Sequence, residues 1–280
     1  MAKRSSGSAC KSPCITGRRS IPIPSKAASL IQSRKGQKQM PVDSQEALNR
    51  SVIYELVSSA FLYPAPGTLE VLIDKASQVQ LAASEMGSPE LAEAVSELAA
   101  SLAEIDEAVL VHEYVTVFGH SMSSECSLYE EEYANSEIFQ KSGSLADLKG
   151  FYAAFGVKPG PELKDRLDHI GVELEFMHLL TFKEAYAQFH GHGPDKVAVC
   201  REAQENFLTN HLAPLVKALV KRLSKRTGGR GFYSSLGQVL ELQIDREMDL
   251  LKVELPTPSL KRPTGPREMD EECGAPSLPG

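Results

Sequence analysis

The sequence lacks the features that mark several large protein classes. It has no tryptophan and no stretch that approaches the length of about 18 consecutive apolar residues typical of a transmembrane helix. It also has no Asn-Gly or Asp-Gly pair and no segment of strict apolar-polar alternation, so hairpins are not predicted. No self-similarity appears at the spacing of about 20–50 residues that repeat proteins show. We therefore expect neither stable membrane insertion nor a sheet or repeat architecture.

Cysteine is scarce and irregularly placed. The five cysteines form no CxxC pair; they are Cys10, Cys14, Cys126, Cys200 and Cys273. This distribution is not that of a disulfide framework, and it favours a reducing cytoplasmic location.

Acidic residues are missing from one region. Residues 1–39 contain nine Lys or Arg and no Asp or Glu, which leaves 21 basic residues against 37 acidic ones in the remainder. The remainder therefore has a net charge near −16, although the whole chain carries −7. An acidic body repels nucleic acid and favours basic partners.

Both ends of the sequence are predicted to be disordered tails. Residues 1–42 are basic and lack apolar periodicity, and residues 255–280 are rich in proline. The Arg18–Arg19 pair is not interpreted as an export signal, because two prolines interrupt the segment after it. The alternative that Met40 is the true first residue stays open, because the segment after it leads directly into the first helix.

Residues 43–254 show helical periodicity almost throughout, which predicts one all-α domain of about nine or ten helices. Predicted N-caps are Asp43 (with Glu46 three residues on), Ser88 followed by Pro89, and Ser144. Pro64, Gly119 and Gly156 are predicted to end helices. Further helices are expected over 161–189, over 194–226 as a pair, and over 232–254.

The segment DHIGVELEFM, residues 168–177, combines an apolar stripe with charged residues. On a helix over 161–189 the predicted buried stripe is Leu167, Ile170, Leu174 and Met177. His169 and Glu173 are then one turn apart, and Asp168 and Glu175 are seven residues apart on the flank of that stripe. We expect these polar side chains at the edge of the buried surface, where they can bind backbone or guanidinium groups of a peptide.

Two other interpretations of His169 remain open from its spacing. It can be a structural histidine bonded to a carbonyl or to Glu173. As a metal ligand it would need partners, but His169, Glu173 and His178 do not form an HExxH motif. We expect no metal.

The run CSLYEEEY, residues 126–133, has two interpretations as well. Its tyrosines and glutamates can receive an arginine-bearing apolar peptide, or the glutamates can simply favour a helix N-terminus. Cys126 lacks an adjacent base, so a nucleophile is disfavoured. The basic residues between Lys217 and Arg230, at the end of one predicted helix, are interpreted as a solvated face, and TGGRG at 227–231 as a turn between helices.

Four short motifs occur in the order that a known protein family shows: YxxxFG (114–119), LYE (128–130), FYxAFG (151–156) and DHIxxELEFM (168–177). Together they resemble the TorD/DmsD/NarJ family of cytoplasmic chaperones for molybdenum enzymes. Within it, the chaperones of type II dimethyl-sulfoxide-reductase-family enzymes look most similar, since EIFQ, LADLKGFY and KEAYA also have counterparts. The resemblance covers roughly residues 45–225.

The resemblance implies a chaperone that is not an enzyme and has no cofactor. Family members bind the apo catalytic subunit, often by its twin-arginine leader, assist cofactor insertion and delay export. By position, the implied peptide-binding residues are Tyr129, Glu130, Asp168 and His169, to which the helical spacing adds Glu173. Leu128 and Leu167 depart from the family, because many members have proline there.

Two alternative functions stay open at this point. One is a helical metal-dependent hydrolase that uses His169 and Glu173; the other is an interaction module with no role in export. The identity of the client and the oligomeric state are not predicted.

Overall fold

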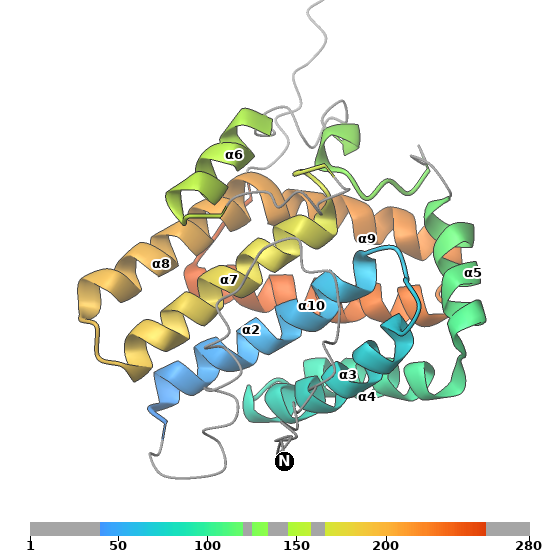
Figure 1. The fold of residues 1–280 in the computed structure, drawn as a ribbon, viewed down its shortest axis with the longest axis horizontal. Coiled ribbons are helices and arrows are strands. Elements are labelled where there is room, and N and C mark those ends of the chain that lie inside the picture. The colour runs from blue at the N-terminus through green and yellow to red at the C-terminus, as the bar shows by residue number, and fades with distance from the viewer. Residues whose placement is uncertain (1–39, 120–124, 134–144, 158–165, 256–280) are drawn as a thin grey trace, which may run out of the picture.

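The computed structural model describes residues 40–119, 125–133, 145–157 and 166–255, and helices dominate these residues (Figure 1). In chain order the α-helices are α2 (Val42–Phe61), α3 (Thr68–Glu85), α4 (Pro89–Glu104), α5 (Glu107–Phe118), α6 (Leu145–Ala154), α7 (Ile170–Phe189), α8 (Pro194–Phe207), α9 (Ala213–Thr227) and α10 (Phe232–Leu251). A 3₁₀ turn, η2 (Glu130–Tyr133), and a π-helical turn, η4 (Leu208–Leu212), complete the set. The predicted all-α class is confirmed for the described part of the chain.

Several predicted helix ends are confirmed by their caps. The Ser88 hydroxyl accepts a hydrogen bond from the Leu91 N–H at 3.4 Å, with Pro89 at the first helical position of α4. Helix α5 ends at Gly119, whose φ of +82° favours glycine. The TGGRG segment forms the turn between α9 and α10, as predicted.

Three predictions about helix boundaries are wrong. The cap of α2 is Pro41, and Asp43 lies inside the first turn without a side-chain cap. Helix α3 fills the interval between Pro64 and Ser88, for which no helix was predicted. Helix α7 begins at Ile170, because residues 166–169 form a turn that precedes it. The Ser144 cap and residues 1–39, 158–165 and 256–280 lie outside the described residues.

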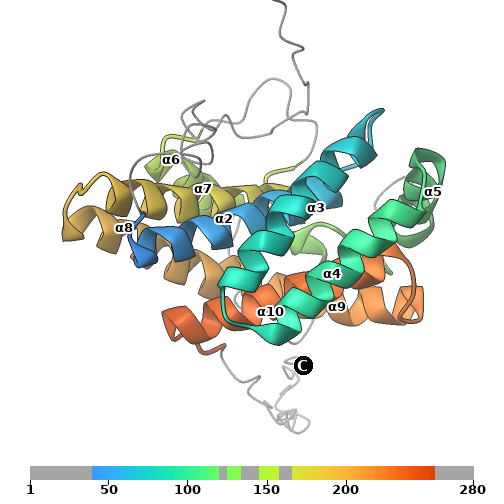
Figure 2. The ribbon, with the colours of Figure 1, turned by 90° about the horizontal axis from the view of Figure 1, so that it is seen from below.

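Helix α7 lies at the centre of the helical arrangement. It packs between α2 and α8 in Figure 1, and α2 in turn contacts α3. Figure 2 shows α3 and α4 side by side across the bundle, with α10 against α4 and α9 against α10. One apolar cluster, with members from α2 to α10, fills the interior. A smaller cluster joins the start of α2 to α7 through Ala47, Leu48, Phe182 and Ala185.

The central position of α7 explains its unusual composition. Every residue from Ile170 to Phe182 is buried, including Glu173, Glu175 and His178. A helix enclosed on all sides has no solvent face for its polar residues. The predicted stripe is confirmed at Ile170, Leu174 and Met177, but Leu167 precedes the helix and is only partly buried.

Among the described helices, none is long and apolar enough to span a membrane.

Candidate functional site

The two segments predicted to bind a peptide are brought together by the backbone. Tyr129 and His169 form an isolated antiparallel β-bridge. The N–H of Ile170 donates to the Leu128 carbonyl at 2.8 Å, and the N–H of Glu130 donates to the Asp168 carbonyl at 2.9 Å. The predicted residues Tyr129, Glu130, Asp168 and His169 therefore form one site, although about 40 residues separate the two pairs in the sequence.

His169 has a structural role at the start of α7. Its Nδ1 accepts a hydrogen bond from the Gly171 N–H at 3.0 Å, so the imidazole caps the helix. Its ring lies edge-on to Tyr129, with centroids 5.2 Å apart. His169 therefore has a structural contact with a backbone N–H at the start of α7, and its role in peptide binding stays a prediction.

Helix α2 lies close to the backbone at Gly171, and the absence of a side chain there leaves room for both α2 and the capping histidine. A Cβ at this position would lie 2.9 Å from the Leu62 side chain and 3.2 Å from the Ser58 carbonyl oxygen. Any larger residue would therefore push α7 away from α2 and displace the capping histidine.

Asp168 forms the floor of the site. Its carboxylate accepts from Arg166 through Nε at 3.0 Å and Nη2 at 2.7 Å, and from the Glu131 N–H at 3.2 Å. Arg166 also pairs with the Glu131 carboxylate, and its guanidinium lies over the Tyr129 ring, 5.1 Å from the centroid. The side chain of Asp168 is 2% exposed and that of Arg166 is 34% exposed, so a partly exposed cation covers a buried anion.

Glu130 faces the interior on the other side of the bridge. Both of its carboxylate oxygens lie 3.2 Å from Nδ1 of His211. His211 belongs to η4, the π-helical turn between α8 and α9, and its Nε2 lies 3.3 Å from Asp147 of α6. Glu130 therefore anchors the bridge to two further elements, through a histidine that the sequence analysis did not single out.

Glu173 is a buried carboxylate whose two oxygens make no hydrogen bond to any residue that the structure describes. Burial raises its pKa well above the ordinary value, and the neighbouring charges of Glu130 and Asp168 raise the pKa further. Tyr152 of α6 is close enough that this negative charge adds to the effect of burial in raising the tyrosine pKa. The carboxyl groups of Glu130, Asp168 and Glu173 thus lie near one another in a buried region, where like charges repel.

These positions correct the sequence-based expectation of polar residues at the edge of the buried surface. Asp168, His169 and Glu173 are 1%, 2% and 0% exposed. Asp168 also precedes α7, so the comparison with Glu175 along one helix is wrong. The exposed part of the site consists of Tyr129, Glu131 and Arg166, of which only Tyr129 was predicted.

The basic end of α9 helps to hold the bridge segment in place. Arg222 lies over the Tyr133 ring at 4.1 Å, and Arg226 pairs with Glu125 at 2.6 Å. Arg226 also donates to the Thr116 carbonyl. Arg226 is exposed, as the predicted solvated face requires, whereas Arg222 is half-buried against Tyr133.

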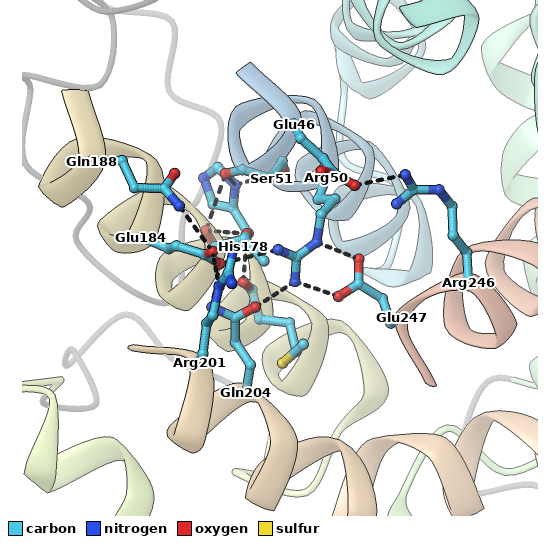
Figure 3. A network of polar contacts seen from close by, with 12 residues as sticks. Glu46, Arg50, Ser51, His178, Glu184, Gln188, Arg201, Gln204, Arg246 and Glu247 are labelled. Atoms are coloured by element: carbon cyan, nitrogen blue, oxygen red, sulfur yellow. Dashed lines mark hydrogen bonds and ion pairs between the residues drawn. The ribbon is translucent and has the colours of Figure 1, made fainter. Parts of the chain in front are cut away.

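The sequence analysis also missed a buried polar network, shown in Figure 3. Arg50 of α2 donates to Glu247 of α10 at 2.7 Å and 2.5 Å and to Glu184 of α7 at 3.0 Å, and it contacts Gln204 of α8. Burial opposes the charge, but the two carboxylates raise the Arg50 pKa above its usual range. The network links four helices, α2, α7, α8 and α10. In the sequence, the indication of such a network is the charged Arg50 within the apolar stripe of α2.

Neither nucleophile nor metal chemistry finds support among the described residues. Burial raises the pKa of the Cys126 thiol to about 11, which keeps the thiol protonated near neutral pH. Within the ranges that the structure describes, no three His, Cys, Asp or Glu side chains are grouped so that they could hold a metal ion.

Comparisons with known proteins bear on this site. The family model described as "Nitrate reductase delta subunit" matches residues 85–221, a range that includes both bridge segments. A relative from Dechloromonas aromatica (strain RCB), named "Perchlorate reductase assembly chaperone protein", is 28% identical over 217 residues. That alignment covers 75% of this chain and 93% of the relative.

Proposed function

Because the chain belongs to the NarJ/TorD-like family of molybdoenzyme chaperones, we propose that it binds the apo catalytic subunit of one molybdenum-containing oxidoreductase during assembly. The client is a member of the type II dimethyl-sulfoxide-reductase group. The protein acts in the cytoplasm without catalysis of its own, assists insertion of the molybdenum cofactor and delays export.

The contact that we propose is between the bridge site and the twin-arginine leader of the client. The observation that carries this proposal is the antiparallel bridge, which gathers Tyr129, Asp168 and Glu131 around a guanidinium, that of Arg166. Charge-assisted, two-point contacts of this kind are the strong form of arginine recognition. Beneath the site Glu130 adds a buried carboxylate beside His211, and the net charge near −16 outside residues 1–39 attracts a basic segment.

The roles of the five predicted residues differ in this proposal. Tyr129 and Asp168 contact the peptide, His169 holds the start of α7, and Glu130 fixes the bridge through His211. Glu173 makes no contact with the peptide, since it is fully buried.

Binding of a leader peptide to the purified protein tests the proposal. Titration calorimetry with the leader of a candidate client should show affinity that falls as salt rises, because surface charge attraction is screened. Asp168→Ala and Glu130→Ala should each weaken binding. Undiminished binding in both variants would contradict the site assignment, and binding only to the mature subunit would favour an interaction module without a role in export.

A further inference from the structure

Tyr129, Glu131 and Asp168 surround the guanidinium of Arg166, and we call these three residues the guanidinium cup. The Asp168 carboxylate receives two parallel N–H donors from Arg166, at 3.0 Å and 2.7 Å. The Tyr129 ring supplies a flat face 5.1 Å from the guanidinium carbon, and Glu131 supplies a second carboxylate. A planar group with a fixed fork of donors satisfies all three contacts, whereas a lysine ammonium satisfies only the charge.

The cup does not depend on Arg166 for its shape. The Asp168 backbone is held by its carbonyl, which accepts from the Glu130 N–H at 2.9 Å. Its side chain also accepts from the Glu131 N–H at 3.2 Å. Both bonds come from η2, so the carboxylate stays oriented toward the same point in space when the arginine leaves.

The occupant of the cup is far more accessible than its floor. The Arg166 side chain is 34% exposed and that of Glu131 is 62% exposed, against 2% for Asp168. Arg166 lies two residues before Asp168, in the turn that precedes α7 and outside any helix. Because Arg166 is partly exposed and lies outside any helix, another guanidinium can take its place, and Asp168 then stays paired throughout.

We propose that the guanidinium cup binds an arginine side chain of the client, and that Arg166 competes for the same position. This inference rests on the proposed function, because it assumes a client recognised by an arginine-bearing segment. Arg166 keeps the buried Asp168 paired while no client is bound, and a client arginine replaces it. The apparent affinity for the client is then reduced by the fraction of molecules in which Arg166 fills the cup.

The test compares wild type with Arg166→Gln in peptide binding. The probe is a fluorescent peptide with two adjacent arginines followed by an apolar segment, and a matched peptide carries two lysines instead. Arg166→Gln should bind the arginine peptide about tenfold more tightly than wild type, as expected when an occupant fills the site about nine-tenths of the time. The lysine peptide should bind more weakly than the arginine peptide to both proteins.

Arg201→Gln is the matched control. Arg201 also covers a buried carboxylate from a half-exposed position, with Nε 2.6 Å from Glu184, but it lies on α8 away from the cup. This variant should bind the arginine peptide like wild type. Arg166→Lys should fall between wild type and Arg166→Gln, and it provides a second variant if Arg166→Gln does not fold, as judged by thermal unfolding.

The outcomes separate this inference from the function on which it rests. If wild type binds the arginine peptide and Asp168→Asn weakens binding, but the Arg166 variants bind no more tightly than wild type, the competition is wrong and the proposed function stands. If no protein binds either peptide, both the proposed function and this inference are overturned.

Discussion

Replacement of Arg50 by methionine tests how the polar network positions α7. The guanidinium lies at 1% exposure and pairs with two carboxylates that are both fully buried. After its removal Glu184 keeps Arg201 at 2.6 Å and Gln204 at 3.0 Å, but among the described residues Glu247 keeps only the Gln243 amide at 2.8 Å. An uncompensated buried charge of this kind costs about 3–5 kcal/mol.

The loss should appear in equilibrium unfolding by urea at pH 7, followed by far-UV circular dichroism. Since small domains have free energies of unfolding of about 5–15 kcal/mol, the expected loss is a large share of the total. Arg246→Met is the matched control, because Arg246 pairs with the more exposed Glu46 at 2.8 Å and should cost at most about 1 kcal/mol. A loss in Arg50→Met no larger than that of Arg246→Met would refute the reasoning.

The pH dependence gives an independent check on the same network. Burial opposes ionisation of Glu184, but Arg50 and its other partners lower the net pKa of this carboxyl below its ordinary value. A depressed folded-state pKa contributes stability above the unfolded-state value, and that stability disappears as the pH falls through the folded-state pKa. The difference in unfolding free energy between wild type and Arg50→Met should therefore become smaller as the pH falls.

Addition of Glu247→Met to Arg50→Met should restore much of the lost unfolding free energy, because the unpaired buried carboxylate is then removed.

Three further predictions concern the site and its surroundings. Glu173→Gln should raise the free energy of unfolding at pH 7 by about 1–3 kcal/mol. The gain should vanish below the ordinary carboxyl pKa, because a raised folded-state pKa lowers stability only when the pH exceeds that ordinary pKa. A gain in unfolding free energy that is equal at pH 3.5 and pH 7 would contradict this. Gly171→Ala should lower stability by about 1–3 kcal/mol in thermal unfolding, because its Cβ would lie 2.9 Å from Leu62, whereas Gly150→Ala, with nothing within 4 Å, should not. Cys126 should react with iodoacetamide at pH 8 far more slowly in the folded than in the urea-unfolded protein, because burial raises its pKa to about 11; equal rates would show that the thiol is accessible and ionised.

Local signals in the sequence were sufficient for most of the helical framework. Some helix boundaries depend only on residues within one helical turn, so they could be predicted correctly. Examples are the start of α4 at Ser88 and Pro89 and the end of α5 at Gly119. The spacing of the buried residues of α3 also indicates a helix, so this helix could have been predicted; these residues are Leu72, Ala76, Val79 and Ala83.

The start of α7 could not be obtained in the same way. Periodicity extends the predicted helix back to Pro161, but the Asp168 carbonyl and the Ile170 N–H form hydrogen bonds with residues 130 and 128. A contact between segments this far apart in sequence leaves no trace in the spacing of either one. The same limit applies to Arg50, whose presence in an apolar stripe signals a buried partner without naming Glu247, 197 residues away.

The candidate site was predicted in its membership but not in its environment. The resemblance brought Tyr129, Glu130, Asp168 and His169 together, and the bridge confirms that they are neighbours. Burial of these side chains depends on how α2, α8 and η4 pack against α7, which helix spacing does not specify. Arg166 could not be predicted as part of the site for a related reason, since its role depends on its contacts with Tyr129, Glu131 and Asp168.

Cross-linking of the apo catalytic subunit to a chosen surface position tests the central claim most directly. A photoreactive amino acid at the exposed position 132, next to the guanidinium cup, is compared with one at Leu81, which is 49% exposed on α3. The account predicts that position 132 cross-links to the arginine-bearing leader of the subunit, as mapped by mass spectrometry, and that position 81 does not. Leader cross-links from position 81 alone, or none from position 132, would contradict it.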